Sequence, residues 1–309
     1  MTVIESRTWD AFERKLKAIQ AEVGTPTSPL LYRGQGNSEW RVETTLERGG
    51  ENRMSFRSYY ELLCGIGPEI GTFTGTDVPG YDQDVANAFS RPDLLWDFPR
   101  RFPDLPLYRF MVYLRHFSFP SPLLDWSRSP YVAAFFAFRH ESPAKKRSIY
   151  VYCEKPRGSK GMTIGEPFIL PMGPYVQSHP RHFRQRGDYT ICGGFDKQEQ
   201  QWHFEPHQKV FDDTRVSQIN QQDSLWKFNL PSTLREKVLG VLNDYNLNAF
   251  SIFGSEESLL ETMWFKEHIL RQSSFREYRD RMGRLRAAVS GKTENAVSSD
   301  ARDKPINKR

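Results

Sequence analysis

Near the start of the chain, apolar residues recur at steps of three and four positions. They are Trp9, Phe12, Leu16, Ile19 and Val23. This spacing places the apolar side chains on one face of a helix, so the pattern predicts an amphipathic helix over residues 9–23. The Gly- and Pro-containing residues 24–29 then end that helix.

Short apolar runs bounded by turn-forming residues are typical of buried strands. Such runs predict strands over residues 30–33, 148–153, 167–170, 188–192, 225–230 and 249–253. Stepwise apolar spacing predicts further helices over residues 54–66, 107–117, 233–243 and 256–270. Strands and helices follow one another irregularly, without the strand–helix rhythm of a parallel sheet. We therefore expect an α+β fold with a mixed central sheet and flanking helices.

One further helix is expected to lie in the centre of the molecule. Ser129 is a suitable N-cap, and Pro130 fits the first helical position, where its missing N–H group costs nothing. Residues 131–138 that follow are apolar on nearly every side. A helix of that kind is normally buried.

The predicted elements divide the chain into three parts. Residues 1–24 form the N-terminal helical segment, residues 25–282 a single domain, and residues 283–309 a tail. Within the domain, residues 67–106 are rich in Gly, Pro and Asp and are expected to form long loops. In the tail, Ser, Asn, Lys and Asp replace apolar residues, so we expect it to be disordered.

Composition excludes several classes of protein. The chain is 38% hydrophobic and 26% charged, which is ordinary for a globular domain and unlike collagen or a coiled coil. It has no run of 18 apolar residues that could span a membrane, and its first residues lack the apolar stretch of a signal peptide. Three separated cysteines, Cys64, Cys153 and Cys192, indicate a cytoplasmic protein without a disulfide framework.

The net charge of +5 invites a nucleic-acid-binding interpretation, but most of this charge lies in the tail. Residues 283–309 hold seven Lys or Arg and three Asp or Glu, so the remaining chain is nearly neutral. A basic tail can make weak phosphate contacts, whereas groove binders usually concentrate charge on their fold. Nucleic-acid binding is therefore the least favoured of three functional hypotheses.

The first candidate site is Arg33, which ends an apolar strand and is followed by Gly34 and Gln35. A guanidinium group at the rim of a sheet can hold a phosphate or carboxylate through two parallel hydrogen bonds. The glycine would let a ligand approach the backbone. The alternative is a structural Arg33 that pairs with a buried acid.

The second candidate site is Asp125, which follows two leucines that draw it towards the interior. A buried carboxylate needs partners, and Arg33, His116 or the helix that begins near Ser129 can supply them. Ser127 and Ser129 could also form an anion pocket at that helix N-terminus. The alternative for Asp125 is a structural role that holds its loop in place.

The remaining sequence patterns are weaker evidence for a functional site. Residues 181–191 form a basic, Gly-containing segment that fits a solvated hairpin better than a pocket wall. Two histidine pairs have spacings usable for a metal, His179 with His182 and His203 with His207, but no familiar ligand set completes either pair. We therefore expect no metal site.

Two motifs about ninety residues apart together resemble the FRG-domain family, which takes its name from a Phe-Arg-Gly motif. The first motif is Tyr-Arg-Gly-Gln at residues 32–35, followed by Trp40 and Arg48; the second is Leu-Leu-Asp-Trp-Ser at residues 123–127, followed by Ala-Phe-Phe-Ala at 134–137. The resemblance covers about residues 25–270. Tyr32 stands in place of the naming Phe. Before the second motif, Arg115 replaces the usual Gln, and Ser-Pro at residues 121–122 replaces Thr-Arg.

The family's layout is similar to that of ADP-ribosyltransferases, so the resemblance implies NAD as the substrate. By this resemblance Arg33 would bind the NAD phosphates together with Gly34 and Gln35, and Ser127 would order the nicotinamide pocket. His116 and Asp125 would orient these groups or hold a ribose hydroxyl.

The acid that such enzymes use is the uncertain element of the resemblance. Gln185 stands where an acid is expected, with Asp188 and Glu199 as alternatives. If Gln185 occupies this place, the site would bind NAD-like ligands and catalyse poorly.

Three functions are therefore open. The first is an ADP-ribosyltransferase-like or NAD-consuming protein of a bacterial or phage conflict system, as a toxin or an antiviral defence effector with a protein or nucleic-acid acceptor. The second is a non-catalytic FRG module that binds a nucleotide signal or a protein partner. The third is nucleic-acid binding.

Overall fold

A computed structural model describes most of the chain. The residues outside the described part are 24, 26–27, 52, 76, 79, 83–104, 162, 164, 175, 177–178, 214–221, 273–274, 276–277 and 285–309. Most of the predicted loop over 67–106 and nearly all of the predicted tail therefore lie outside it. The fold forms two compact units, Met1–Gly254 and Ser255–Arg309. Among the described residues, no helix combines the length and the apolar character that crossing a bilayer requires.

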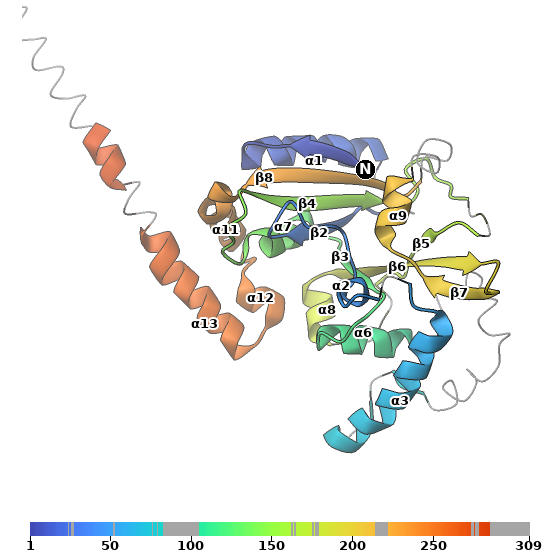
Figure 1. Cartoon of the computed structure of the whole chain (residues 1–309). Helices are drawn as coiled ribbons and strands as arrows, with labels where there is room; N and C mark the ends of the chain where they lie inside the picture. Colours follow the sequence, from blue (N-terminus) through green and yellow to red (C-terminus); the bar gives the residue numbers. More distant parts are fainter. Residues whose placement is uncertain are drawn as a thin grey trace, which may run out of the picture. The chain divides into compact units, whose positions relative to one another are not determined.

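The first unit is built on a mixed eight-stranded sheet (Figure 1). Its strands are β1 (Thr2–Glu5), β2 (Leu31–Gln35), β3 (Leu124–Ser127), β4 (Lys146–Cys153), β5 (Phe168–Pro171), β6 (Gly187–Asp196), β7 (Gln201–Phe204) and β8 (Ser224–Pro231). Their order across the sheet is β1-β8-β4-β2-β3-β6-β5, with β7 paired to β6. β1 and β8 are parallel and the other pairs are antiparallel. The expected α+β class is confirmed.

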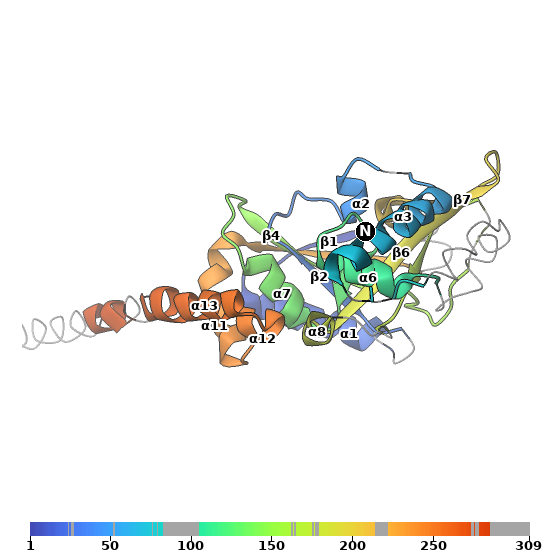
Figure 2. The same ribbon diagram turned by 90° about the horizontal axis from the view of Figure 1, so that it is seen from below.

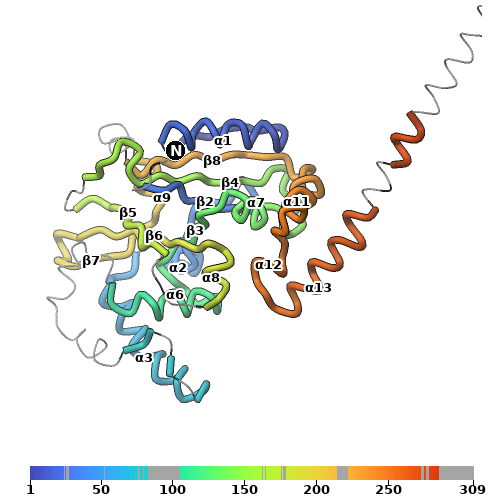
Figure 3. The backbone as a smooth tube through the Cα atoms, turned by 180° about the vertical axis from the view of Figure 1, so that it is seen from behind, coloured from blue at the N-terminus to red at the C-terminus, as the bar shows by residue number. Residues whose placement is uncertain are grey.

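Helices cover both faces of this sheet. In the first unit they are α1 (Trp9–Val23), α2 (Thr45–Arg48), α3 (Phe56–Thr74), α6 (Tyr108–His116), α7 (Pro130–Phe138), α8 (Pro180–Arg184), α9 (His207–Asp212), α11 (Arg235–Asp244) and α12 (Ala249–Phe253). α1 lies along β8, where Phe12 packs edge-on against Phe228 (Figures 1 and 3). Figure 2 shows α1 and α7 on one side of the strands and α2 on the other. The second unit begins with α13 (Glu256–Trp264), which continues as a π-helical turn over Phe265–Leu270.

The central helix α7 forms as predicted. The Ser129 side chain accepts a hydrogen bond from the N–H group of Val132, and Pro130 occupies the first turn. At the other end, Arg147 donates to the carbonyl oxygens of Ala137 and His140, each at 2.7 Å. These bonds satisfy carbonyl groups that the end of a helix leaves without partners.

Contact between α7 and β2 depends on a glycine. A Cβ atom on Gly34 would lie 1.8 Å from the carbonyl oxygen of Ala133 and 2.6 Å from the backbone nitrogen of Ala137. Both are backbone atoms of α7, so neither can move aside without displacing the helix. Gly34 is therefore needed for close packing of helix against strand, a role that the sequence analysis did not consider.

Two predicted elements differ from the structure. Residues 249–253 form the helix α12, because Asn248 and Ser251 make a capping box at its start and Gly254, at φ 69°, ends it. The predicted loop over 67–106 is wrong at its beginning, since α3 continues to Thr74 before Gly75 ends it. The sequence analysis also missed β1, β3 and β7, which are four residues each.

We expect Gly34→Ala to lower the free energy of unfolding by about 2 kcal/mol or more, because the added methyl group overlaps the backbone of α7. Gly36→Ala is the matched control, since its Cβ atom would meet the nearest atom, the carbonyl oxygen of Ala137, at 3.8 Å. That change should stay within about 0.5 kcal/mol. Urea denaturation of both variants measures the difference, and equal stability would refute the proposed packing role.

Candidate functional site

A cavity of about 740 Å³ lies at the split between β2 and β3. β2 is paired with β4 along all five of its residues, but with β3 at a single register position, Tyr32 opposite Ser127. Beyond that position the two strands separate. The cavity is lined by residues of β2, β3 and β6, by one side of α7, and by the loop that follows β2.

Arg33 and Asp125 meet in this cavity, as the sequence analysis expected. The Arg33 Nη1 atom lies 2.7 Å from Asp125 Oδ1 and donates a hydrogen bond of 2.7 Å to the Asp125 carbonyl oxygen. Arg115, from α6, donates from Nη2 to the same Oδ1 atom at 2.6 Å. One carboxylate oxygen therefore serves two guanidinium groups. Asp125 is not fully interior, because 46% of its side chain is exposed, whereas that figure is 11% for Arg33.

The charges around Asp125 keep it ionised. Desolvation raises the pKa of this carboxyl, but the positive charges of Arg115 and Arg33 and their hydrogen bonds outweigh it and hold the pKa well below its usual value. Burial, followed by the charges of Arg33 and Arg115, lowers the pKa of Arg48. Three guanidinium groups thus lie near one carboxylate.

The cavity as a whole carries excess positive charge. Its Arg, Asp and Glu lining residues, taken with Arg115, which binds Asp125 but does not line the cavity, are Arg33, Arg41, Glu43, Arg48, Asp125, Glu141 and Arg147. Five arginines against three acids leave an excess of two positive charges. Such a cavity favours an anionic ligand.

Ser127 lies in the cavity wall, but its hydroxyl group is already hydrogen-bonded. It donates to the backbone oxygen of Gln185 at 2.7 Å and accepts from the N–H group of Ser129 at 3.0 Å. The expected anion pocket at the N-terminus of α7 is therefore wrong: Ser129 does not line the cavity, and its N–H group already has a partner. The middle and C-terminal part of α7 lines the cavity instead.

The loop after β2 is held over the cavity by two hydrogen bonds. Gln35, only 7% exposed, donates from Nε2 to the Arg41 carbonyl oxygen at 2.9 Å. The hydroxyl group of Tyr150 donates to the Trp40 carbonyl oxygen at 3.2 Å. The indole ring of Trp40 is 57% exposed and lines the cavity, where it offers a flat apolar surface.

His116 does not line the cavity, so its expected place beside Arg33 and Asp125 is wrong. It ends α6, and its ring centroid lies 5.9 Å from that of His179. Burial, and then the charges of His179, His182 and nearby arginines, lowers its pKa to about 4. His116 thus directly follows Arg115, which pairs with Asp125, but His116 itself lies outside the cavity.

Gln185 lines the cavity, while the two alternative acids do not. Asp188 is 2% exposed, and its carboxylate accepts a 2.9 Å hydrogen bond from Arg128 Nε. Glu199 lies beyond the end of β6, in the turn before β7. Of the three residues considered for the position of the catalytic acid, only Gln185 lines the cavity, and its side chain is an amide rather than an acid.

The lining residues that were not proposed as site residues include Trp40, Glu43, Arg48 and Tyr189. The signal for two of them was present, because Trp40 and Arg48 belong to the motif that carries the family resemblance. Glu43 stands in no motif that the sequence analysis used, and Tyr189 lies in the segment 181–191, which was interpreted as a solvated hairpin. Tyr189 is placed by the antiparallel pairing of β3 with β6, in which it lies opposite Asp125.

The structure does not bring the two histidines of either metal-spaced pair together as one group of ligands among the described residues. The Nδ1 atom of His179 accepts from the N–H group of Arg181, and the Nε2 atom of His182 lies 3.3 Å from the Pro174 carbonyl oxygen. His207 is completely buried, with Nε2 2.9 Å from the hydroxyl group of Thr190. The ring nitrogens of His179, His182 and His207 are thus directed to separate partners.

The comparison with known families gives one result. Residues 28–146 match the family model of the FRG domain. This confirms the resemblance over a shorter stretch than the 25–270 estimated from the motifs, and the matched stretch contains Arg33, Arg48, Arg115 and Asp125. No curated protein and no solved structure matches the chain.

Stability should depend on the protonation of His116. Its pKa in the folded protein, about 4, lies below its ordinary value of 6.5, so the unfolded chain binds more protons between these values. The free energy of unfolding should therefore fall as the pH drops from about 6.5 to about 4, by on the order of 1 kcal/mol for this partly exposed ring.

We expect His116→Gln to reduce this slope in urea denaturation measured across that pH range. His179 and His182, whose pKa values are also lowered by burial, should maintain a residual slope. His268→Gln is the control, because His268 is exposed in the second unit. An unchanged slope in His116→Gln would contradict the assignment.

Proposed function

We propose that this chain, which contains an FRG domain over residues 28–146, binds a phosphorylated nucleotide of the NAD type in the cavity between β2 and β3 and cleaves it as an ADP-ribosyltransferase-like enzyme. The observation that carries the proposal is the convergence of Arg33, Arg48, Arg115 and Asp125 on that cavity.

Size and charge of the cavity support a nucleotide. Its volume lies in the range of about 300–1,000 Å³ that is usual for small-molecule sites. The pyrophosphate linkage of NAD is dianionic and would balance the excess of two positive charges. Planar guanidinium groups suit such a group because they can donate two hydrogen bonds at once.

The aromatic residues of the lining suit the rings of a dinucleotide. Trp40 at one side and Tyr189 at another offer flat faces on which a base can stack. The Trp40 side chain is 57% exposed, and burying an indole is favourable. A stacked base would remove part of that apolar surface from water.

The proposed reaction breaks the bond between the ribose carbon and the nicotinamide nitrogen. The bonding electron pair leaves with nicotinamide, whose ring becomes neutral, and positive charge develops on the ribose. A nucleophile, either water or an acceptor side chain, then bonds to that carbon and releases a proton. Asp125, which stays ionised, is the group proposed to accept a hydrogen bond from a ribose hydroxyl.

One observation favours a second candidate, a module that binds the nucleotide without cleaving it. The Asp125 carboxylate is shared by two guanidinium groups, so little negative charge remains to stabilise a developing cation. Gln185 supplies an amide where the resemblance implies an acid. Both features weaken catalysis and leave binding intact.

The biological setting is proposed from the family resemblance alone. We propose a role in a bacterial or phage conflict system, as a toxin or defence effector that acts in the cytoplasm on a protein or nucleic-acid acceptor. Nucleic-acid binding by the folded domain is not favoured by the cavity, which is a concave site rather than an open basic surface.

Isothermal titration with NAD tests the proposed ligand. Arg33→Ala should weaken binding at least about tenfold, because a charge-assisted bidentate contact is lost. Arg33→Lys keeps the charge but not the fork, and should weaken binding less. Arg57→Ala, which removes an exposed arginine of α3 paired with Glu61, should leave the affinity unchanged.

Mass spectrometry of the same samples with cell lysate separates the two candidates. Release of nicotinamide that is lost in Arg33→Ala supports the enzyme, whereas NAD binding without nicotinamide release supports the binding module. Thermal melting confirms that each variant is folded. Unchanged NAD affinity in a folded Arg33→Ala variant, or no NAD binding by the original chain, would overturn the proposed site.

A further inference from the structure

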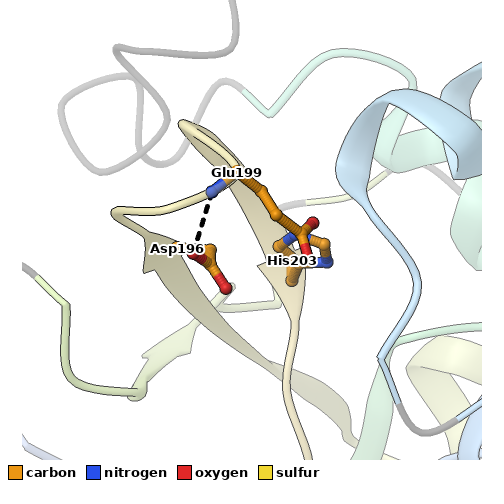
Figure 4. Close-up of side chains that lie close together, drawn as sticks. All are labelled: Asp196, Glu199 and His203. Atoms are coloured by element: carbon orange, nitrogen blue, oxygen red, sulfur yellow. Dashed lines mark hydrogen bonds and ion pairs between the residues drawn. The ribbon is translucent and has the colours of Figure 1, made fainter.

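A second group of side chains that can bind a metal ion lies in the hairpin formed by β6 and β7 (Figure 4). Asp196 is the last residue of β6, Glu199 lies in the connecting turn, and His203 is the third residue of β7. One side-chain oxygen or nitrogen from each lies within 4.8 Å of the others. None of the three lines the cavity described above.

His203 gives an independent reason to look for a ligand here. It is only 5% exposed, and neither of its ring nitrogens makes a hydrogen bond among the described residues. Its Nε2 atom nevertheless lies 2.9 Å from Glu199 Oε2, in an orientation that does not satisfy a hydrogen bond. A buried imidazole whose nitrogens make no hydrogen bond is costly, and binding a cation through Nε2 would satisfy that atom.

The spacing of these atoms suits adjacent ligands of one ion. With metal–ligand bonds of about 2.0–2.2 Å, two neighbouring ligand atoms lie about 2.8–3.1 Å apart in octahedral geometry and about 3.3–3.6 Å apart in tetrahedral geometry. The 2.9 Å between His203 and Glu199 lies within the octahedral range. An oxygen of the Asp196 carboxylate lies within 4.8 Å of the ligand atoms of both other residues.

We propose that Asp196, Glu199 and His203 form a binding site for a divalent transition-metal ion such as Zn²⁺ or Mn²⁺. One imidazole and two carboxylates form a mixed nitrogen and oxygen set, which suits these ions better than Ca²⁺ or Mg²⁺. Three protein ligands leave further coordination positions for water, and Glu199 lies at the surface with 46% of its side chain exposed.

A competing cation is already present in the cluster. The guanidinium group of Arg53 pairs with Asp196, lies 3.5 Å from Glu199 Oε1, and lies 3.3 Å from Glu205 Oε1. A metal ion must displace Arg53 from Asp196 and Glu199, whereas the pair with Glu205 can remain. The proposal therefore makes an unusual prediction: removing Arg53 should strengthen metal binding, because the two carboxylates lose their competitor.

Isothermal titration of the full chain with ZnCl₂, and separately with MnCl₂, tests this site. We expect one ion per chain, with affinity at least about tenfold weaker in Asp196→Asn and in His203→Gln. Arg53→Ala should bind the ion at least about threefold more tightly, since a competing positive charge is gone. Arg57→Ala is the matched control, an exposed arginine outside the cluster, and should not change the affinity.

The outcomes decide between a metal site and an ordinary network of surface ion pairs. Asp196→Asn keeps the shape of the side chain, so it serves even if His203→Gln, at a buried position, fails to fold. Equal affinity in Asp196→Asn, no binding at millimolar metal, or weaker binding in Arg53→Ala would each overturn the proposal. Because the hairpin lies outside the cavity, NAD affinity should be unchanged in Asp196→Asn whatever the result of the NAD experiment.

Discussion

Two arginines share one carboxylate oxygen, and the cavity depends on this arrangement. Arg33 comes from β2, Arg115 from the end of α6 and Asp125 from β3, so three segments are joined at one atom. The like charges of two adjacent guanidinium groups repel each other, and Asp125 offsets that repulsion only in part. Arg48 adds a third positive group nearby, whose pKa is lowered by burial and by these charges. The cluster of Arg33, Arg115 and Asp125 therefore joins three segments of the fold and still carries excess positive charge, which favours an anion.

The position of the cavity follows from a steric constraint at the contact between β2 and α7. Because Gly34 has no side chain, α7 lies directly against the strand, and its alanine-rich flank forms a cavity wall. Arg147 fixes the C-terminal end of the same helix through the carbonyl oxygens of Ala137 and His140. The cavity thus needs a small residue at position 34 for packing, which explains the glycine of the motif without assigning it a contact to the ligand.

Patterns within a short window were enough to predict α1, α7 and the strands β2, β4, β5, β6 and β8, because apolar spacing and capping residues act locally. The sequence also predicted that Arg33 and Asp125 would meet, since both stand in motifs. His116 failed because its neighbour Arg115, replacing a glutamine, is the residue that reaches Asp125. The strand predicted over 249–253 failed because its capping box with Asn248 outweighs the apolar run. Contacts such as Arg53 with Glu205 depend on how segments far apart in the chain come together, which no single window contains.

Water in the cavity determines how strongly its charged groups interact. About half of the Asp125 side chain is exposed, so water screens its attraction to Arg33 and Arg115. A ligand that fills the cavity removes this water and strengthens every remaining charge interaction. An uncharged ligand would then leave the excess positive charge of the lining uncompensated, and a dianion would neutralise it. Electrostatics therefore selects ligands by charge before shape is considered, and it favours a pyrophosphate over a neutral nucleoside of the same size.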